Sequence, residues 1–149
     1  SLSGSCGCRN IEVVWHTIDY SPVPRACQCA YCSSKSAAYV SKPGTGFDVT
    51  VRNRELHRRV QQGSNSAVFH ECANCDQLVF VSAEINGELY GALNANCLSN
   101  KFGFSPTVGA NYNSQSAGER LARWQQNWCC PVVVTGLGSG QVPPPKSGK

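Results

Sequence analysis

Seven of the ten cysteines fall in three tight clusters, and this clustering constrains the fold more than any other feature. The clusters are Cys6-x-Cys8, Cys27-x-Cys29-x-x-Cys32 and Cys72-x-x-Cys75. Stabilising disulfides usually join distant cysteines, because closing a long loop constrains the unfolded chain most. Metal sites instead gather their thiolates, because each sulfur must lie about 2.3 Å from one ion. The spacing therefore favours metal binding, with a secreted disulfide protein as the weaker alternative.

Length and composition indicate one small globular domain. The chain has 149 residues, 41% hydrophobic and 15% charged, which suits a domain with a hydrophobic core. We predict a single domain over residues 1–135 and a disordered tail rich in Gly and Pro over 136–149. The first ten residues are neither basic nor apolar, so we expect no signal peptide and a cytoplasmic location. No stretch approaches the roughly 18 apolar residues of a membrane helix, so we expect no membrane partner. The net charge of +4 is too small to favour nucleic acid as a partner.

Most of the chain has the pattern of β-structure. Residues 47–52 alternate, with Phe47, Val49 and Val51 separated by polar side chains, as in a half-buried strand. Further runs rich in β-branched and aromatic residues predict strands over 11–17, 37–41, 66–72, 77–85 and 87–93. Two of these strands meet at Cys72-x-x-Cys75, which predicts a zinc-knuckle hairpin.

One helix is predicted near the C-terminus, over residues 116–128. Its apolar residues recur at helical spacing and share one face: Ala117, Leu121, Trp124 and Trp128. Ser116 and Glu119 match a capping box, in which each side chain satisfies a free backbone N–H of the other residue. The fold class is therefore mainly β with a short C-terminal helical segment.

Two of the clusters together supply the four thiolates of a structural zinc site. Alternate residues of a strand point to one side, so Cys6 and Cys8 can present two sulfurs from one strand end. Cys72 and Cys75 would present two more from the knuckle. Four cysteines make a closed tetrahedral set, which would join the start of the chain to residue 75.

Cys27, Cys29 and Cys32 then form a group of three, which is one short of a closed site. Three protein ligands with an exchangeable fourth position are typical of a catalytic zinc. That position would take water, hydroxide or a thiolate. The alternative is a second structural site closed by another side chain: Cys97, Cys129, Cys130, His16, His57 or His70. Cys97, Cys129 and Cys130 lack the spacing typical of metal ligands, and cysteines of this kind are more often small buried residues.

The stretches GSCGCRNIEV, CQCAYC and FHECANC carry a resemblance to a known family. Over roughly residues 3–98 the chain resembles the glutathione-dependent formaldehyde-activating enzymes, also called the centromere-protein-V-like family. The resemblance implies a β-tent fold with two zinc ions per chain. It places a structural zinc on Cys6, Cys8, Cys72 and Cys75, and a catalytic zinc on Cys27, Cys29 and Cys32.

The same resemblance implies a carbon–sulfur lyase that joins glutathione or a similar thiol to formaldehyde or another small aldehyde. The alternative is a non-catalytic zinc module that binds a protein or nucleic acid, because fold does not fix function. The chain departs from the family at Asp76, where members usually have Gly. Asp tolerates a positive φ better than most residues, so we expect the knuckle to survive. Ser36, Ala37 and Ala38 also depart from the usual small-Gly-Ala pattern, in a segment expected near the open metal position.

Two further features have a functional and a structural interpretation. The basic residues Arg52, Arg54, Arg58 and Arg59 would steer the carboxylates of glutathione, although a solvated strand face is the more frequent origin of such a run. The aromatic residues Trp15, Tyr39 and Phe47 would line a pocket, although each is more often part of a core.

Overall fold

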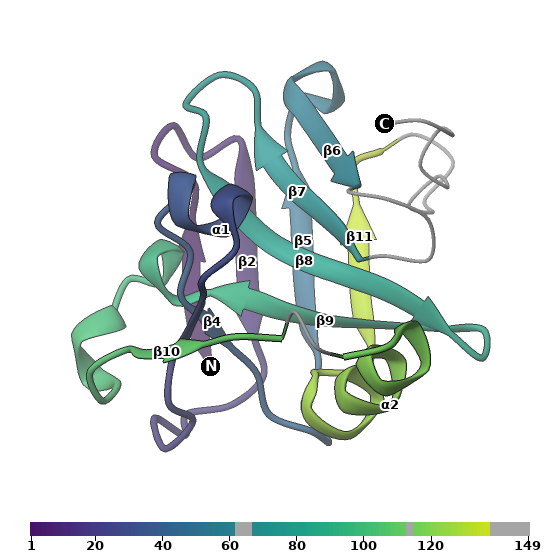
Figure 1. Cartoon of the computed structure of the whole chain (residues 1–149). Coiled ribbons are helices and arrows are strands. Elements are labelled where there is room, and N and C mark those ends of the chain that lie inside the picture. Colours follow the sequence, from purple (N-terminus) through teal and green to yellow (C-terminus); the bar gives the residue numbers. More distant parts are fainter. Residues whose placement is uncertain (62–66, 113–114, 138–149) are drawn as a thin grey trace.

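Two β-sheets make up most of the molecule. The computed structural model describes residues 1–61, 67–112 and 115–137 (Figure 1). The first sheet has the strand order β1 (Leu2–Ser5), β2 (Ile11–Trp15), β5 (Phe47–Val51) and β11 (Val132–Thr135). The second has the order β10 (Val108–Ala110), β3 (Arg25–Cys27), β4 (Tyr39–Val40), β9 (Glu88–Asn94), β8 (Leu78–Ile85), β7 (Val68–Cys72) and β6 (His57–Gln61). The prediction of a mainly β fold is confirmed.

Helical segments are short, apart from the helix near the C-terminus. They are α1 (Ala30–Ser34), α2 (Ala117–Asn127) and the 3₁₀ turns η1 (Arg54–Leu56), η2 (Ala95–Cys97) and η3 (Lys101–Gly103). The predicted capping box begins α2: Ser116 Oγ accepts from the Glu119 backbone N–H at 3.1 Å, and Glu119 Oε1 accepts from the Ser116 N–H at 2.7 Å. In the described part of the chain, no helix is long and apolar enough to cross a membrane.

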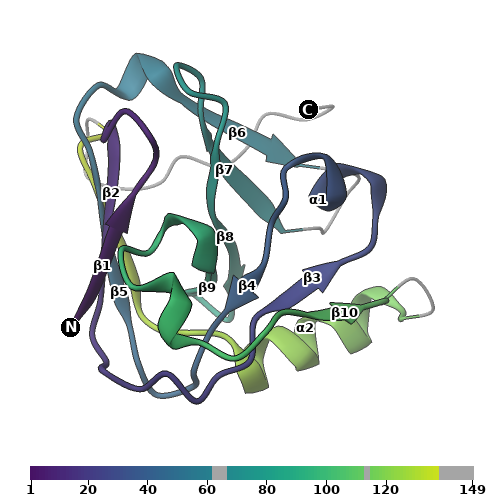
Figure 2. The ribbon, with the colours of Figure 1, turned by 90° about the vertical axis from the view of Figure 1, so that its left-hand side faces the viewer.

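The main core lies between the two sheets, which face each other across it in Figure 2. Phe47 of the first sheet packs edge-on against Phe80 of the second, with ring centroids 5.8 Å apart. Trp15 and Leu93 are also fully buried in this cluster. Trp15 and Phe47 are therefore core residues, as their residue type favours, and only Tyr39 of the three aromatic candidates faces a pocket.

The opposite face of the second sheet is covered by α2. Val81, Ala83 and Ile85 alternate along β8, so their side chains point to this face. Trp124 of α2 and Trp128, the C-cap residue of that helix, pack on them, and the two tryptophan rings are stacked with centroids 4.8 Å apart. This layer holds α2 against the sheet and fixes one wall of the pocket described below.

Several elements were not predicted from the sequence. β11 adds to β5 in parallel, and β10 adds to β3 in parallel. Both pairings join distant segments, and β3 and β10 have only three residues each, which is too few for a periodic pattern to show. The predicted tail at 136–149 falls outside the described residues from 138 onward, and Leu137 packs against the main core.

Gly91 lies where β9 meets the other sheet, which gives a test of the packing between sheets. A Cβ at Gly91 would lie 2.7 Å from Val81 O and 2.9 Å from Phe47 Cζ, whereas a Cβ at Gly118 of α2 would meet nothing within 4 Å. We expect Gly91→Ala to lower the free energy of unfolding by about 1–3 kcal/mol, because the overpacked sheets must move apart. Gly118→Ala should leave it unchanged or raise it by less than about 1 kcal/mol. Urea unfolding measures both, and equal effects would contradict this packing.

Candidate functional site

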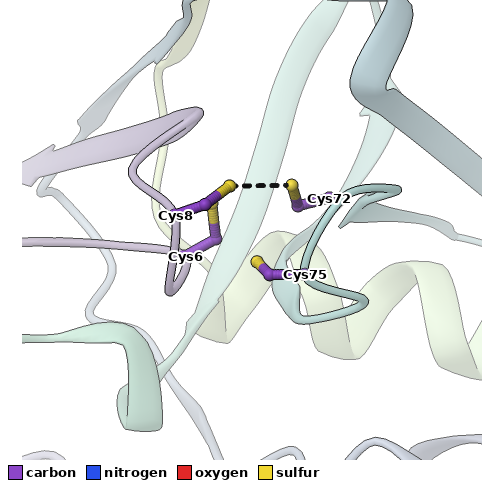
Figure 3. Close-up of side chains that lie close together, drawn as sticks. All are labelled: Cys6, Cys8, Cys72 and Cys75. Atoms are coloured by element: carbon purple, nitrogen blue, oxygen red, sulfur yellow. Dashed lines mark hydrogen bonds between the residues drawn. The ribbon is translucent and has the colours of Figure 1, made fainter.

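Four cysteine sulfurs converge between two turns, one from each sheet (Figure 3). Cys6 and Cys8 lie in the turn between β1 and β2, and Cys72 and Cys75 flank the turn between β7 and β8. The Sγ atoms of Cys6 and Cys8 are 3.8 Å apart, those of Cys8 and Cys72 are 3.6 Å apart, and all four lie within 4.8 Å of one another. Four sulfurs at about 2.3 Å from one tetrahedral ion would be about 3.8 Å apart, so this set fits a metal such as zinc.

The two turns have the backbone conformation that convergence requires. The Cys6 carbonyl accepts from the Arg9 N–H at 3.0 Å, and the Cys72 carbonyl accepts from the Asp76 N–H at 2.7 Å. Arg9 and Asp76 both adopt positive φ, of 65° and 62°. Asp76 therefore takes the left-handed conformation that was expected at this position from the sequence. Cys6 and Cys8 lie just past the end of β1, so the turn brings their sulfurs together, and strand alternation does not.

The protonation of these thiols shows why a cation suits the site. Burial raises the pKa of Cys6 to about 12. The pKa of Cys8 is lowered to about 6, chiefly by a hydrogen bond with the Asn74 side chain. Neighbouring thiols therefore oppose each other's ionisation, and a divalent cation would allow all four to bind as thiolates.

The second cluster forms at the start of α1. Cys27 ends β3, Cys29 is the N-cap of α1, and Cys32 lies in the first turn, where its N–H donates to Cys29 Sγ at 3.3 Å. The three Sγ atoms lie within 4.8 Å of one another, with Cys32 buried and the other two half-buried. A hydrogen bond with Cys32 is the main cause that lowers the pKa of Cys27 to about 5, and the same contact raises that of Cys32. This donor set also fits a soft divalent metal.

No fourth protein ligand completes this cluster within the part of the chain that the structure describes. The proposed closing side chains have other partners. His57 Nε2 and His70 Nδ1 form a hydrogen bond of 2.9 Å, and His16 Nε2 lies 2.9 Å from Asp48 Oδ2. Cys97 donates to the Leu78 carbonyl at 3.4 Å, inside the main core. Cys129 is likewise buried in the main core, and Cys130 lies 3.5 Å from a Glu88 carboxylate oxygen.

Cys27, Cys29 and Cys32 line a cavity of about 420 Å³. This lies within the range of about 300–1,000 Å³ typical of small-molecule sites. The walls are Tyr39, the apolar Phe69 and Val81, and one face of α2 with Trp124 and Trp128. The Tyr39 hydroxyl lies 3.2 Å from Cys32 Sγ, and burial is the main cause that raises its pKa far above the usual range. Tyr39 therefore keeps its proton and presents a hydrogen-bond donor beside the sulfurs.

The positive charges of the pocket come from residues that the sequence did not single out. Arg25, Arg120 and Arg123 line the cavity, and none of the basic run at 52–59 does. Within that run, Arg52 pairs with Glu12 at 2.8 Å and Arg58 with Glu71 at 2.7 Å. Arg120 and Arg123 lie three residues apart on α2, and Arg25 joins them because β3 borders the same cavity.

A buried carboxylate ties α1 to the four-cysteine site. Glu71, next to Cys72, is 2% exposed and accepts from the Tyr31 hydroxyl and from Arg58 Nε at 2.7 Å. Lys35, at the end of α1, lies 3.4 Å from the same carboxylate and 3.0 Å from Asp76. These contacts position α1, and with it Cys29 and Cys32, on the knuckle of β7 and β8.

Removing this carboxylate tests whether it positions the second cluster. We expect Glu71→Ala to lower the free energy of unfolding by roughly 3–5 kcal/mol, because it leaves Lys35 and Tyr31 without their buried partner. Glu12→Ala removes an exposed partner of Arg52 and should cost less than about 1 kcal/mol. Urea unfolding compares the two variants. Losses of equal size would show that Glu71 has no special positioning role.

Metal removal tests the role of the four-cysteine site in stability. We expect a strong chelator to lower the thermal midpoint of the parent protein sharply, because a structural zinc site contributes apparent free energy of about 10–16 kcal/mol. Cys75→Ser should start at the lowered midpoint and respond little to chelator. Cys130→Ser, outside both clusters, should behave as the parent does. An unchanged midpoint in Cys75→Ser would contradict a stabilising metal.

Comparisons with known proteins bear on the fold. No family model matches the chain, and no curated protein matches it. A crystal structure of a Rhodobacter sphaeroides protein, solved as a structural-genomics target, superposes with a TM-score of 0.54 at 22% identity. The match covers 71% of this chain and 99% of that one. At this identity the likeness supports the fold alone.

Proposed function

We propose that the chain is a zinc enzyme that joins a small thiol, such as glutathione, to a small aldehyde, such as formaldehyde. The observation that carries the proposal is the three-cysteine cluster with no fourth protein ligand among the described residues, facing a cavity of small-molecule size. The resemblance of the cysteine pattern to the glutathione-dependent formaldehyde-activating enzymes supports the same chemistry. On this proposal, Cys6, Cys8, Cys72 and Cys75 hold a structural zinc.

Cys27, Cys29 and Cys32 would hold the second zinc at the cavity wall. Bound there, zinc lowers the pKa of a thiol and polarises a carbonyl as a Lewis acid. The cavity brings the two substrates together, which accounts for most of the rate gain in an addition of this kind. The apolar side chains of Phe69, Val81 and Trp124 limit the water that competes for the aldehyde.

The reaction is an addition that needs no oxidant or reductant. The thiol sulfur attacks the carbonyl carbon, so that a C–S bond forms as the C=O π bond breaks. The carbonyl oxygen takes up the proton that the thiol lost, which gives the S-hydroxymethyl product when the aldehyde is formaldehyde. Tyr39 holds a proton at Oη beside the cluster, and we assign it as the donor that stabilises the developing negative oxygen.

Exchange spectroscopy tests the proposal, because thiols and formaldehyde also combine without a catalyst. We expect zinc-loaded protein to accelerate magnetisation exchange between glutathione and S-hydroxymethylglutathione. Cys29→Ser should abolish the acceleration with loss of one metal ion. Tyr39→Phe should keep both metal ions and reduce the acceleration by about 10²-fold. Cys130→Ser serves as the control with parental behaviour.

Exchange at the uncatalysed rate, in parent protein that carries metal at both clusters, would contradict the proposal. Parental acceleration in Cys29→Ser would also contradict it, because the chemistry would then not involve this cluster.

A further inference from the structure

The cavity beside Cys27, Cys29 and Cys32 has a marked excess of positive charge. Three arginines are among its lining residues: Arg25 from β3, and Arg120 and Arg123 from α2. The lining includes no Asp or Glu. Guanidinium groups remain charged at any physiological pH, so these three positive charges persist throughout that range.

In the described part of the chain, these three arginine side chains contact neutral groups and pair with no carboxylate. Arg123 donates to the Gln115 side-chain oxygen and lies over the Tyr112 ring, 3.4 Å from its centroid. Arg120 donates to the Gln115 carbonyl at 3.1 Å, and Arg25 to Ser41 Oγ at 3.4 Å. These contacts hold the guanidinium groups in place and leave their charge uncompensated.

The cysteine cluster with its metal would offset only part of this positive charge. Three thiolates around one divalent cation carry a single net negative charge. Three arginines outnumber it, which leaves an excess of two positive charges in the cavity. This excess of positive charge favours an anionic ligand in addition to the metal. Guanidinium groups bind carboxylates with two parallel hydrogen bonds, so a carboxylate on the thiol substrate matches these arginines.

We propose that the site selects thiols that carry a carboxylate, with the carboxylate held by Arg25, Arg120 and Arg123 and the sulfur held at the three-cysteine cluster. This inference rests on the proposed function and names its substrate class. It also places carboxylate recognition on α2 and at the start of β3, and no longer on the basic run at 52–59. Neutral and cationic thiols of the same size are poor ligands.

Matched thiols test the charge requirement on the metal-loaded parent protein. We compare 3-mercaptopropionate with its uncharged amide, 3-mercaptopropionamide, and with propionate, which lacks the sulfur. Tryptophan fluorescence reports binding, because Trp124 and Trp128 line the cavity and the third tryptophan, Trp15, lies in the core. We expect 3-mercaptopropionate to bind about 10–100-fold more tightly than the amide, as charge-assisted hydrogen bonds predict.

Variants then assign the effect to the pocket. Arg123→Gln and Arg120→Gln should each reduce the preference for the acid over the amide by about tenfold or more, because the acid loses a charge-assisted partner that the amide lacks. Arg54→Gln, in the basic run outside the cavity, should keep the parental preference. Circular dichroism confirms that each variant is folded, and the comparison of thiols on the parent protein does not depend on any variant.

Three results separate the two proposals. Equal affinity for the acid and the amide would overturn the charge requirement and leave the proposed thiol chemistry standing. A parental preference in both Arg123→Gln and Arg120→Gln would overturn the assignment to these arginines. Propionate bound as tightly as 3-mercaptopropionate would show that the sulfur contributes nothing, which would overturn the thiol ligand and the proposed function while leaving the arginines as a carboxylate site.

Discussion

The convergence of four cysteine sulfurs between two turns is the contact on which the rest of the structure depends. One turn belongs to the four-stranded sheet and the other to the seven-stranded sheet, so the cluster joins the two sheets at one end of the core. The aromatic contact of Phe47 with Phe80 and the close approach at Gly91 hold the sheets together elsewhere. With an ion bound, the free energy of metal binding becomes folding free energy for the whole domain.

The pocket is built outward from that junction. Glu71 lies on the same strand as Cys72. Its contacts with Tyr31, Lys35 and Arg58 hold α1 against the knuckle. α1 carries Cys29 and Cys32, so a buried ion-pair network sets the position of the second cluster. The tryptophans of α2 then close the cavity from the other side. The two clusters are thus structurally coupled, one acting as the support on which the other is held.

Local patterns predicted the parts of the fold that have local causes. Strand alternation identified β5, apolar spacing and a capping box identified α2, and the Cys-x-x-Cys spacing identified the knuckle. Asp76 was expected at positive φ for a stereochemical reason, and it adopts that conformation. The grouping of seven cysteines into a set of four and a set of three was also predicted correctly.

The remaining features arise from contacts between distant segments, which no local pattern records. Arg25 and Arg123 are almost one hundred positions apart and meet only because β3 and α2 border one cavity. The run at 52–59 was the more conspicuous basic feature, yet Arg52 and Arg58 satisfy carboxylates elsewhere. Tyr39 resembled a core residue by type, and its contact with Cys32 depends on how β4 follows α1.

The most direct test of the account is the number of metal ions per chain, measured by native mass spectrometry on protein purified without chelator. The account predicts two zinc ions in the parent protein, and one in a Cys29→Ser variant that keeps its fold. A parent chain that carries no metal and has its clustered cysteines paired as disulfides would contradict the account. So would a Cys29→Ser variant that retains both ions, because Cys27, Cys29 and Cys32 would then not form a metal centre.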